Sequence, residues 1–130
     1  MLWDWQEERE LDLAAEEVAS AIREAEMLVK SGHEDVTMAA TSVTFYCDEE
    51  AGRVSYLTKR GVKFIQPRGT LSANIRAGGR LYVVFRKDGF AGSEGNDGRY
   101  TMHLRTKDGK HEKEIAVAMY TGRVRVKKIQ

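Results

Sequence analysis

A single apolar stripe runs through the first quarter of the chain and restricts what the rest can fold into. Apolar side chains recur at three- and four-residue spacing over residues 4–31, and Glu fills many of the remaining positions. Residues three and four apart share a helix face, so this pattern predicts one long amphipathic helix. Asp4 is a suitable N-cap, and Ser31-Gly32 after Lys30 favours a stop. The stripe consists of Leu11, Ala14, Ala15, Val18, Ala21, Ile22, Ala25, Leu28 and Val29.

After Gly32 the sequence changes to short runs of strand-forming residues separated by turns. The first two runs flank Asp48–Gly52 and predict a hairpin, and Pro67 marks a strand end or a sheet edge. One long helix before many strands predicts an α+β fold, in which the N-terminal helix (4–31) packs on an antiparallel β-sheet built from residues 36–130. At 130 residues, a single domain over 1–130 is expected. The expected strands are 43–47, 53–57, 62–65, 71–75, 81–85, 100–105, 114–119 and 123–129.

The charges are unevenly distributed along the chain although they nearly cancel to a net +1. Residues 1–50 contain 14 acidic and 3 basic side chains, whereas residues 51–130 contain 6 acidic and 18 basic ones. This segregation predicts a surface with an acidic and a basic side, unless folding interleaves the two halves.

Residues suited to catalysis are scattered. Cys47 lies in an expected strand, and no CxxC or Cys/His spacing indicates zinc. His33 and His111 lie in expected turns, and His103 alternates with apolar neighbours on a strand. The oxygen-rich loop 88–98 could attract calcium, but its spacing matches no EF-hand and a turn is the preferred interpretation. We therefore expect a protein that is not an enzyme and that uses no cofactor or metal.

The last ten residues combine a glycine turn with strict alternation. Arg123, Arg125 and Lys127 share one side of the expected strand, opposite Val124, Val126 and, past a slip, Ile129. Such a row of cations either protects an edge strand from unwanted pairing or meets an anionic partner.

The chain contains no run of about 18 apolar residues that would span a bilayer. Trp3 and Trp5 at the start of the helix suit a membrane–water boundary, but packing onto the sheet is the preferred interpretation.

Three segments together resemble type IV pilin-like proteins, most closely the GspH/FimT-type pseudopilins and minor pilins. The helix 13–30 is similar to the family's helix in its small and charged end at Ala25–Gly32. Residues 81–92, followed by 100–104, are similar to its strand, Phe and glycine turn. Residues 115–117 and 121–126 are similar to its closing strand pair with a Gly-Arg-x-Arg turn.

The resemblance implies a pilin-like fold and a non-enzymatic subunit of a type IV pilus or type II secretion filament, acting in assembly or at the tip. Other pilin or pseudopilin subunits would be its partners. Family members begin with a leader and an apolar helix of about 20 residues, which this sequence lacks. We therefore expect a soluble globular part of a protein that belongs, through a missing N-terminal helix, to the inner membrane and periplasm or to a cell-surface filament. A natural family member that has lost its anchor is the alternative.

The resemblance also implies a second function, which is capture of double-stranded DNA during natural transformation. The family's Gly-Arg-x-Arg turn maps onto Gly122, Arg123 and Arg125, with Lys127 and Lys128 adjacent. Such binding would neutralise phosphates and be independent of sequence, and the glycine would bring backbone N–H groups near a phosphate. The acidic helix would repel DNA, so the contact must come from the sheet. A third hypothesis, an unrelated adaptor or regulatory domain, stays open.

Overall fold

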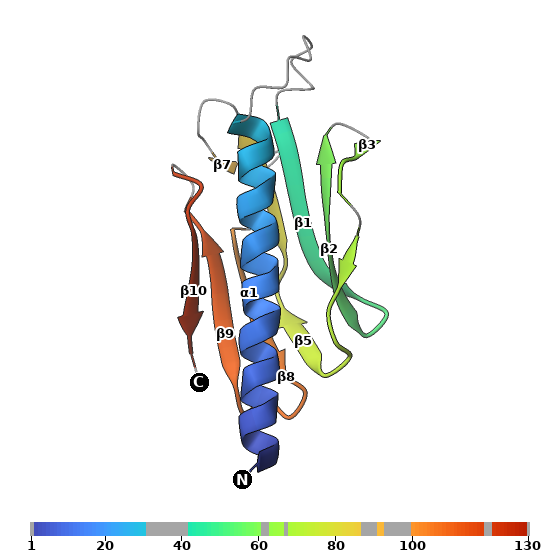
Figure 1. The fold of residues 1–130 in the computed structure, drawn as a ribbon, viewed down its shortest axis with the longest axis vertical. Coiled ribbons are helices and arrows are strands. Elements are labelled where there is room, and N and C mark those ends of the chain that lie inside the picture. The colour runs from blue at the N-terminus through green and yellow to red at the C-terminus, as the bar shows by residue number, and fades with distance from the viewer. Residues whose placement is uncertain are drawn as a thin grey trace.

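The computed structural model describes residues 2–30, 42–60, 63–66, 68–86, 91–92, 100–118 and 121–129. Within these ranges, one long helix precedes ten short strands, and the helix stands in front of the strands along the length of the molecule (Figure 1). The elements are α1 (Leu2–Lys30), β1 (Ser42–Glu50), β2 (Arg53–Arg60), β3 (Lys63–Phe64), β4 (Gly69–Thr70), β5 (Ile75–Gly78), β6 (Leu81–Arg86), β7 (Ala91–Gly92), β8 (Thr101–Thr106), β9 (Glu112–Val117) and β10 (Val124–Lys128).

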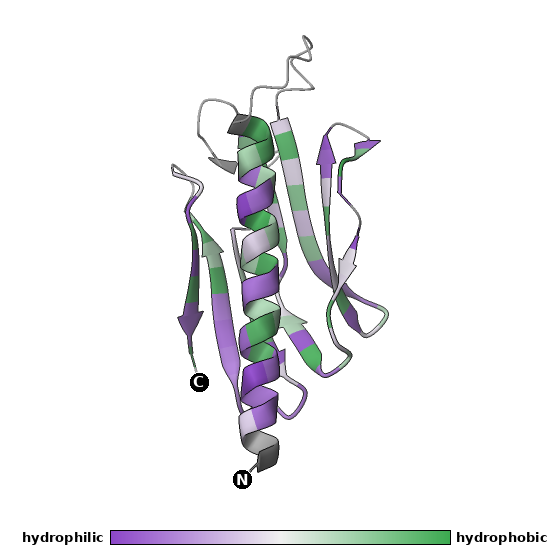
Figure 2. Cartoon of the chain, viewed as in Figure 1, coloured by the Kyte–Doolittle hydropathy of each residue, from purple (hydrophilic) through white to green (hydrophobic). Residues whose placement is uncertain are grey.

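Helix α1 confirms the predicted amphipathic helix. Its buried side chains form one face. Figure 2 shows hydrophobic and hydrophilic segments alternating along the helix ribbon, as an amphipathic helix requires. The buried face is wider than the predicted stripe, because Ala19 is also fully buried. Leu28, which the prediction placed in the stripe, is only partly buried. The helix begins at Leu2, so Asp4 lies in the first turn and the prediction that it is the N-cap is wrong. At the other end, Arg60 donates a hydrogen bond to the Leu28 carbonyl, where the helix dipole favours a cation.

The strands form two antiparallel sheets rather than one. The first has the order β3-β2-β1-β6-β7, with β4 also paired to β2, and the second has the order β10-β9-β8-β5. The Ala77 N–H of β5 donates to a Glu49 carboxylate oxygen of β1 at 3.1 Å, which links the two sheets. The α+β arrangement with an N-terminal helix on antiparallel strands is confirmed.

The first hairpin is tighter than predicted. Glu50 pairs directly with Arg53, so Ala51 and Gly52 alone form the turn. Both have positive φ, 54° and 79°, as a two-residue turn between twisted strands requires. Asp48 and Glu50 belong to β1, and the predicted five-residue turn is wrong.

The predicted strand at residues 71–75 is also wrong. The chain turns at Ala73 and Asn74, and β5 starts only at Ile75. The Asn74 N–H donates to the Ser72 hydroxyl, and the Ile75 N–H donates to the Ser72 carbonyl. Local hydrogen bonds of this kind let Ser and Asn compete with strand pairing.

The other predicted strands 81–85, 100–105, 114–119 and 123–129 correspond to β6, β8, β9 and β10, with shifted ends. Of the predicted strand 62–65, only Lys63–Phe64 form β3. Met119, Pro67, Val62, His33 and the predicted helix stop Ser31-Gly32 lie outside the described residues, as does loop 88–98 apart from β7.

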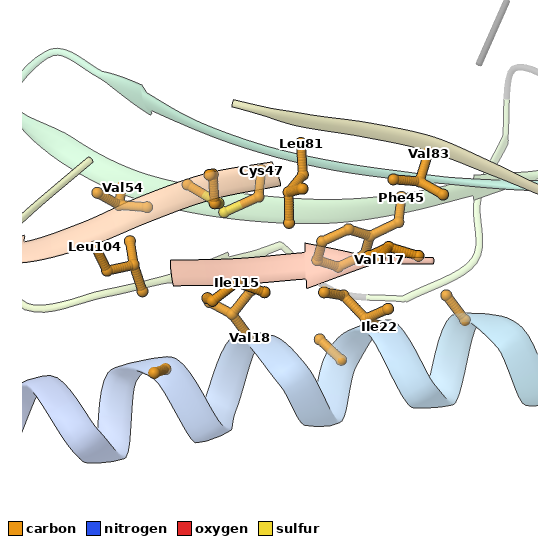
Figure 3. Close-up of a cluster of buried hydrophobic side chains, with 14 of the residues drawn as sticks. Val18, Ile22, Phe45, Cys47, Val54, Leu81, Val83, Leu104, Ile115 and Val117 are labelled. Carbon is orange, nitrogen blue, oxygen red and sulfur yellow. The ribbon is translucent and has the colours of Figure 1, made fainter. Parts of the chain in front are cut away.

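The hydrophobic core lies between α1 and both sheets. Figure 3 shows Val18 and Ile22 of the helix pointing toward strand side chains, among them Phe45 of the first sheet and Ile115 of the second. All four are fully buried. Small side chains buried on the same helix let its backbone approach the strands closely. They are Ala14, Ala15, Ala19, Ala21 and Ala25.

The two tryptophans were expected to pack on the sheet, which is wrong for Trp5. Its side chain is 57% exposed, and the Arg9 guanidinium lies 5.6 Å from its ring centroid. The side chain of Trp3 lies outside the described residues. No helix in the described ranges has both the length and the apolar character needed to cross a membrane.

Candidate functional site

The turn that leads into β10 depends on Gly122, for reasons internal to the fold. Gly122 is buried with φ +70°, and a Cβ there would lie 2.8 Å from a Glu26 carboxylate oxygen and 3.4 Å from the Phe85 ring. The Gly122 N–H donates to the Ala118 carbonyl at 2.8 Å, and the Arg123 N–H donates to the Thr121 hydroxyl at 3.3 Å. Both N–H groups therefore have partners within the turn, which argues against the prediction that this glycine offers them to a phosphate.

Strand β10 confirms most of the predicted alternation. Arg123, Arg125 and Lys127 are exposed, whereas Val124 and Val126 are half-buried against the core. The strand continues this alternation through Lys128, which shares the inward face with the two valines. Ile129 was expected on the inward face, but it follows the strand and is 42% exposed.

The inward position of Lys128 places its ammonium group against the acidic helix. Its Nζ lies 2.8 Å from a Glu8 carboxylate oxygen, and this hydrogen bond and charge raise the pKa of Lys128. Lys113, its cross-strand neighbour on β9, lies 2.6 Å from Asp12. The acidic and basic halves of the sequence therefore meet inside one molecule, where α1 passes β9 and β10.

The outward cations border a pair of carboxylates. Lys127 pairs across the strands with Glu114, which pairs in turn with His103 of β8. The His103 ring lies between Glu112, at 3.0 Å from Nδ1, and Glu114, at 3.6 Å from Nε2. His103 is partly exposed, as the sequence predicts. These two glutamates reduce the positive potential beside Lys127, whereas Arg125 lies opposite uncharged Ala116.

Sequence reasoning missed both sets of partners. Lys128 and Glu8 are 120 residues apart, and the glutamates beside His103 follow from the register of β8 with β9. The spacing of Glu112 and Glu114 indicates two carboxylates on one face of a strand. The sequence does not indicate that His103 of the neighbouring strand lies between them.

A hollow of about 440 Å³ lies near the N-terminal end of α1. One of its carboxyl groups, Asp108, stabilises the β8–β9 turn by accepting hydrogen bonds from the Lys110 N–H and the Thr106 hydroxyl. These bonds lower the pKa of Asp108 to about 2. The hollow is lined by Gln6, Glu7, Glu10, Asn74, Ile75, Thr106, Lys107 and Asp108.

In the described part of the chain, neither Cys47 nor the His, Asp and Glu side chains form a site for nucleophilic or metal chemistry. Cys47 is fully buried in the core, and this burial, with a smaller effect of Asp48, raises the pKa of its thiol to about 12. Among the residues with described placement, no group of three or more His, Cys, Asp or Glu side chains is positioned to hold a metal ion.

The surface of β10 is therefore the best-defined candidate site in the described part of the chain. Its outward cations are Arg125 and Lys127 on the strand, which lies at the end of a sheet, and Arg123 directly before it. Neither a protein-family model, nor a curated protein, nor a solved structure matches this chain.

Proposed function

We propose that this chain is the globular part of a minor pilin or pseudopilin, a non-enzymatic subunit that acts in filament assembly or at a filament tip. The arrangement of one long N-terminal helix on antiparallel strands is compatible with such a subunit. The choice of this family rests on the resemblance of three sequence segments to GspH/FimT-type pseudopilins and minor pilins.

The observation that carries the proposal is the outward face of α1. Leu13 and Met27 are 61% and 67% exposed, although the buried face of the same helix is already packed on two sheets. They are 14 residues apart, which is about four helical turns, so they lie on nearly the same line along the helix. Glu16, Glu17 and Glu24 lie between them on the same face, so Leu13 and Met27 are two separate apolar contact points and not a patch. In a filament, each would pack against the helix of a neighbouring subunit.

Cysteine cross-linking in the cells that make the protein tests this packing. The native Cys47 is fully buried and keeps its proton, so only the introduced surface thiol is expected to react. With a bifunctional reagent that links a thiol to a nearby amine, we expect Leu13→Cys and Met27→Cys to give cross-linked species that contain this chain, because both positions would face neighbouring helices. The matched control is Thr101→Cys, which is also exposed but lies on the sheet. Equal cross-linking at all three positions, or none at any, would contradict helix packing.

A second candidate function is capture of double-stranded DNA. It is favoured by the exposed row Arg123, Arg125 and Lys127, whereas Lys128 is paired with Glu8. Three phosphate contacts predict an affinity that falls about 40-fold between 50 and 200 mM salt.

A titration with short DNA duplexes tests that candidate. Arg123→Ala/Arg125→Ala would abolish salt-sensitive binding, and Lys128→Ala is the matched control, because the Lys128 ammonium is already bound to Glu8. Binding that ignores the two arginines, or no binding at the lower salt concentration, would leave the structural subunit as the function.

A further inference from the structure

Strand β10 has one edge, called the open edge below, that is paired with no strand in the described part of the chain. It is the end strand of the order β10-β9-β8-β5, and β9 is its one partner among the described strands. In Figure 1 it lies at the side of the molecule, next to β9.

The hydrogen-bond register shows which backbone groups face this edge. The Ala118 N–H donates to the Arg123 carbonyl, and the Ile129 N–H donates to the Glu112 carbonyl. In an antiparallel pair, hydrogen-bonded residues alternate with residues whose N–H and C=O point away from the partner. Residues 123, 125, 127 and 129 thus bond toward β9, and the backbone groups of Val124, Val126 and Lys128 point to the open edge.

The side chains along the edge fall into two chemically different rows. Arg123, Arg125 and Lys127 project from the outward face of the sheet and are exposed. Val124 and Val126 project inward and are half-buried, so the core does not cover them completely. The edge therefore offers backbone donors and acceptors, an outward cationic row and an inward apolar row.

We propose that the open edge of β10 binds an extended acidic peptide segment of a partner protein by strand addition. The peptide backbone would pair with the N–H and C=O groups of Val124, Val126 and Lys128. Its residues opposite Arg125 and Lys127 would then occupy non-hydrogen-bonded pairs, in which facing side chains are closest. Carboxylates at these alternate positions meet the cations, while small apolar residues between them extend the row of Val124 and Val126.

The charges select this ligand over a second copy of the chain. Two β10 edges brought together would place cation rows opposite each other, because both copies carry Arg123, Arg125 and Lys127, and like charges in facing pairs are unfavourable. They also favour a peptide over DNA. Glu114 lies across from Lys127 and would repel a phosphate backbone that followed the row. A peptide on the open edge is separated from Glu114 by β10 itself, so its carboxylates meet Arg125 and Lys127 on the side away from that glutamate.

The experiment uses the whole chain and a capped nine-residue peptide that alternates Glu with Val, at low salt. Amide hydrogen exchange of the protein, followed by NMR, is the readout. We expect the peptide to slow exchange at Val124, Val126 and Lys128 by about tenfold or more at saturation, because these N–H groups become hydrogen-bonded. A peptide that alternates Lys with Val keeps the apolar residues and should give no protection. Strand addition uses none of the outward residues of α1, so this result and cross-linking at Leu13 can fail independently.

Two variants and one modified peptide separate edge pairing from attraction by charge. Val126→Pro removes an N–H that points to the open edge and leaves the bonds to β9 in place, and Val126→Ala is its matched control. We expect affinity to fall at least about tenfold in the proline variant and only slightly in the alanine variant. A Glu–Val peptide methylated on the backbone nitrogens of its Val residues, which would pair with β10, tests the same bonds without altering the protein, and it should also lose binding.

Three outcomes would overturn the proposal. One is absence of binding by the Glu–Val peptide, and another is binding without protection at Val124, Val126 and Lys128. The third is undiminished binding of the methylated peptide, which would show attraction by charge alone. If duplex DNA, and not the peptide, binds in a manner that requires Arg125, the surface is a nucleic-acid site.

Discussion

Replacing Gly122 by Ala tests whether this glycine is required by the fold or by a ligand. Its φ of +70° lies in the left-handed region, which costs a residue with a Cβ roughly 1–2 kcal/mol. The new Cβ would also lie 2.8 Å from a Glu26 carboxylate oxygen. That oxygen is the end of a flexible side chain, so relieving the contact should add less than about 1 kcal/mol. We expect Gly122→Ala to lower the free energy of unfolding by about 1.5–3 kcal/mol.

Gly109→Ala is the matched control, because Gly109 has φ +76° and a Cβ there would meet no atom within 4 Å. It should show the backbone cost alone, about 1–2 kcal/mol. Urea unfolding followed by circular dichroism measures both variants. A third variant, Gly122→Ala with Glu26→Ala, should recover the steric part of the loss, which appears as a coupling energy of about 0.5–1 kcal/mol.

A Gly122→Ala variant as stable as the parent would refute the turn geometry, since neither positive φ nor the Glu26 contact would then exist. A variant no less stable than Gly109→Ala would refute the contact alone. If Gly122→Ala keeps full affinity for any anionic ligand while losing stability, the glycine serves the fold.

Three further predictions concern the core and the charges. At pH 11 the Cys47 thiol of the unfolded chain, with its ordinary pKa of 9.0, is ionised, whereas the native thiol with pKa about 12 keeps its proton. Stability should therefore fall as pH rises from about 9 to 12, by roughly 3 kcal/mol from this group at pH 11, and urea unfolding of Cys47→Ala should show a shallower pH slope. A double-mutant cycle of Lys113→Met and Asp12→Ala should give a coupling of about 1 kcal/mol that shrinks in 1 M salt; zero coupling at low salt would show that the contact contributes nothing. Phe45→Ala should cost about 3–5 kcal/mol in urea unfolding, because Phe45 is fully buried between the layers, and a loss below about 1 kcal/mol would contradict that packing.

Periodicity predicts an element well when the signal is contained within that element. The helix, its buried face, and the strands around Phe45, Val83 and Leu104 follow from local spacing of apolar residues. The same reasoning fails at Leu71–Ile75, where a composition suited to a strand contains Ser72 and Asn74, whose hydrogen bonds form a turn. It also treated the strands as one sheet, because strand spacing alone does not tell which strands pair.

The candidate site was predicted in part. Outward exposure of Arg123, Arg125 and Lys127 follows from alternation within β10. The role of Lys128 does not, because it depends on where Glu8 lies after α1 has packed beside β10. Ile129 was expected to turn inward because it is apolar, but the regular pleat of β10 assigns the inward position to Lys128 instead.

The cations at and beside β10 lie on two faces of the sheet, and those on each face have a different role. Lys128 faces inward and joins β10 to the acidic helix, in the same manner as Lys113 of β9 joins Asp12. Arg123, Arg125 and Lys127 face outward beside backbone groups that no described strand pairs. A row of like charges prevents two copies from pairing through this edge, and the same row attracts a strand of opposite charge. Protection against self-association and selectivity for an acidic partner are therefore two consequences of one electrostatic arrangement.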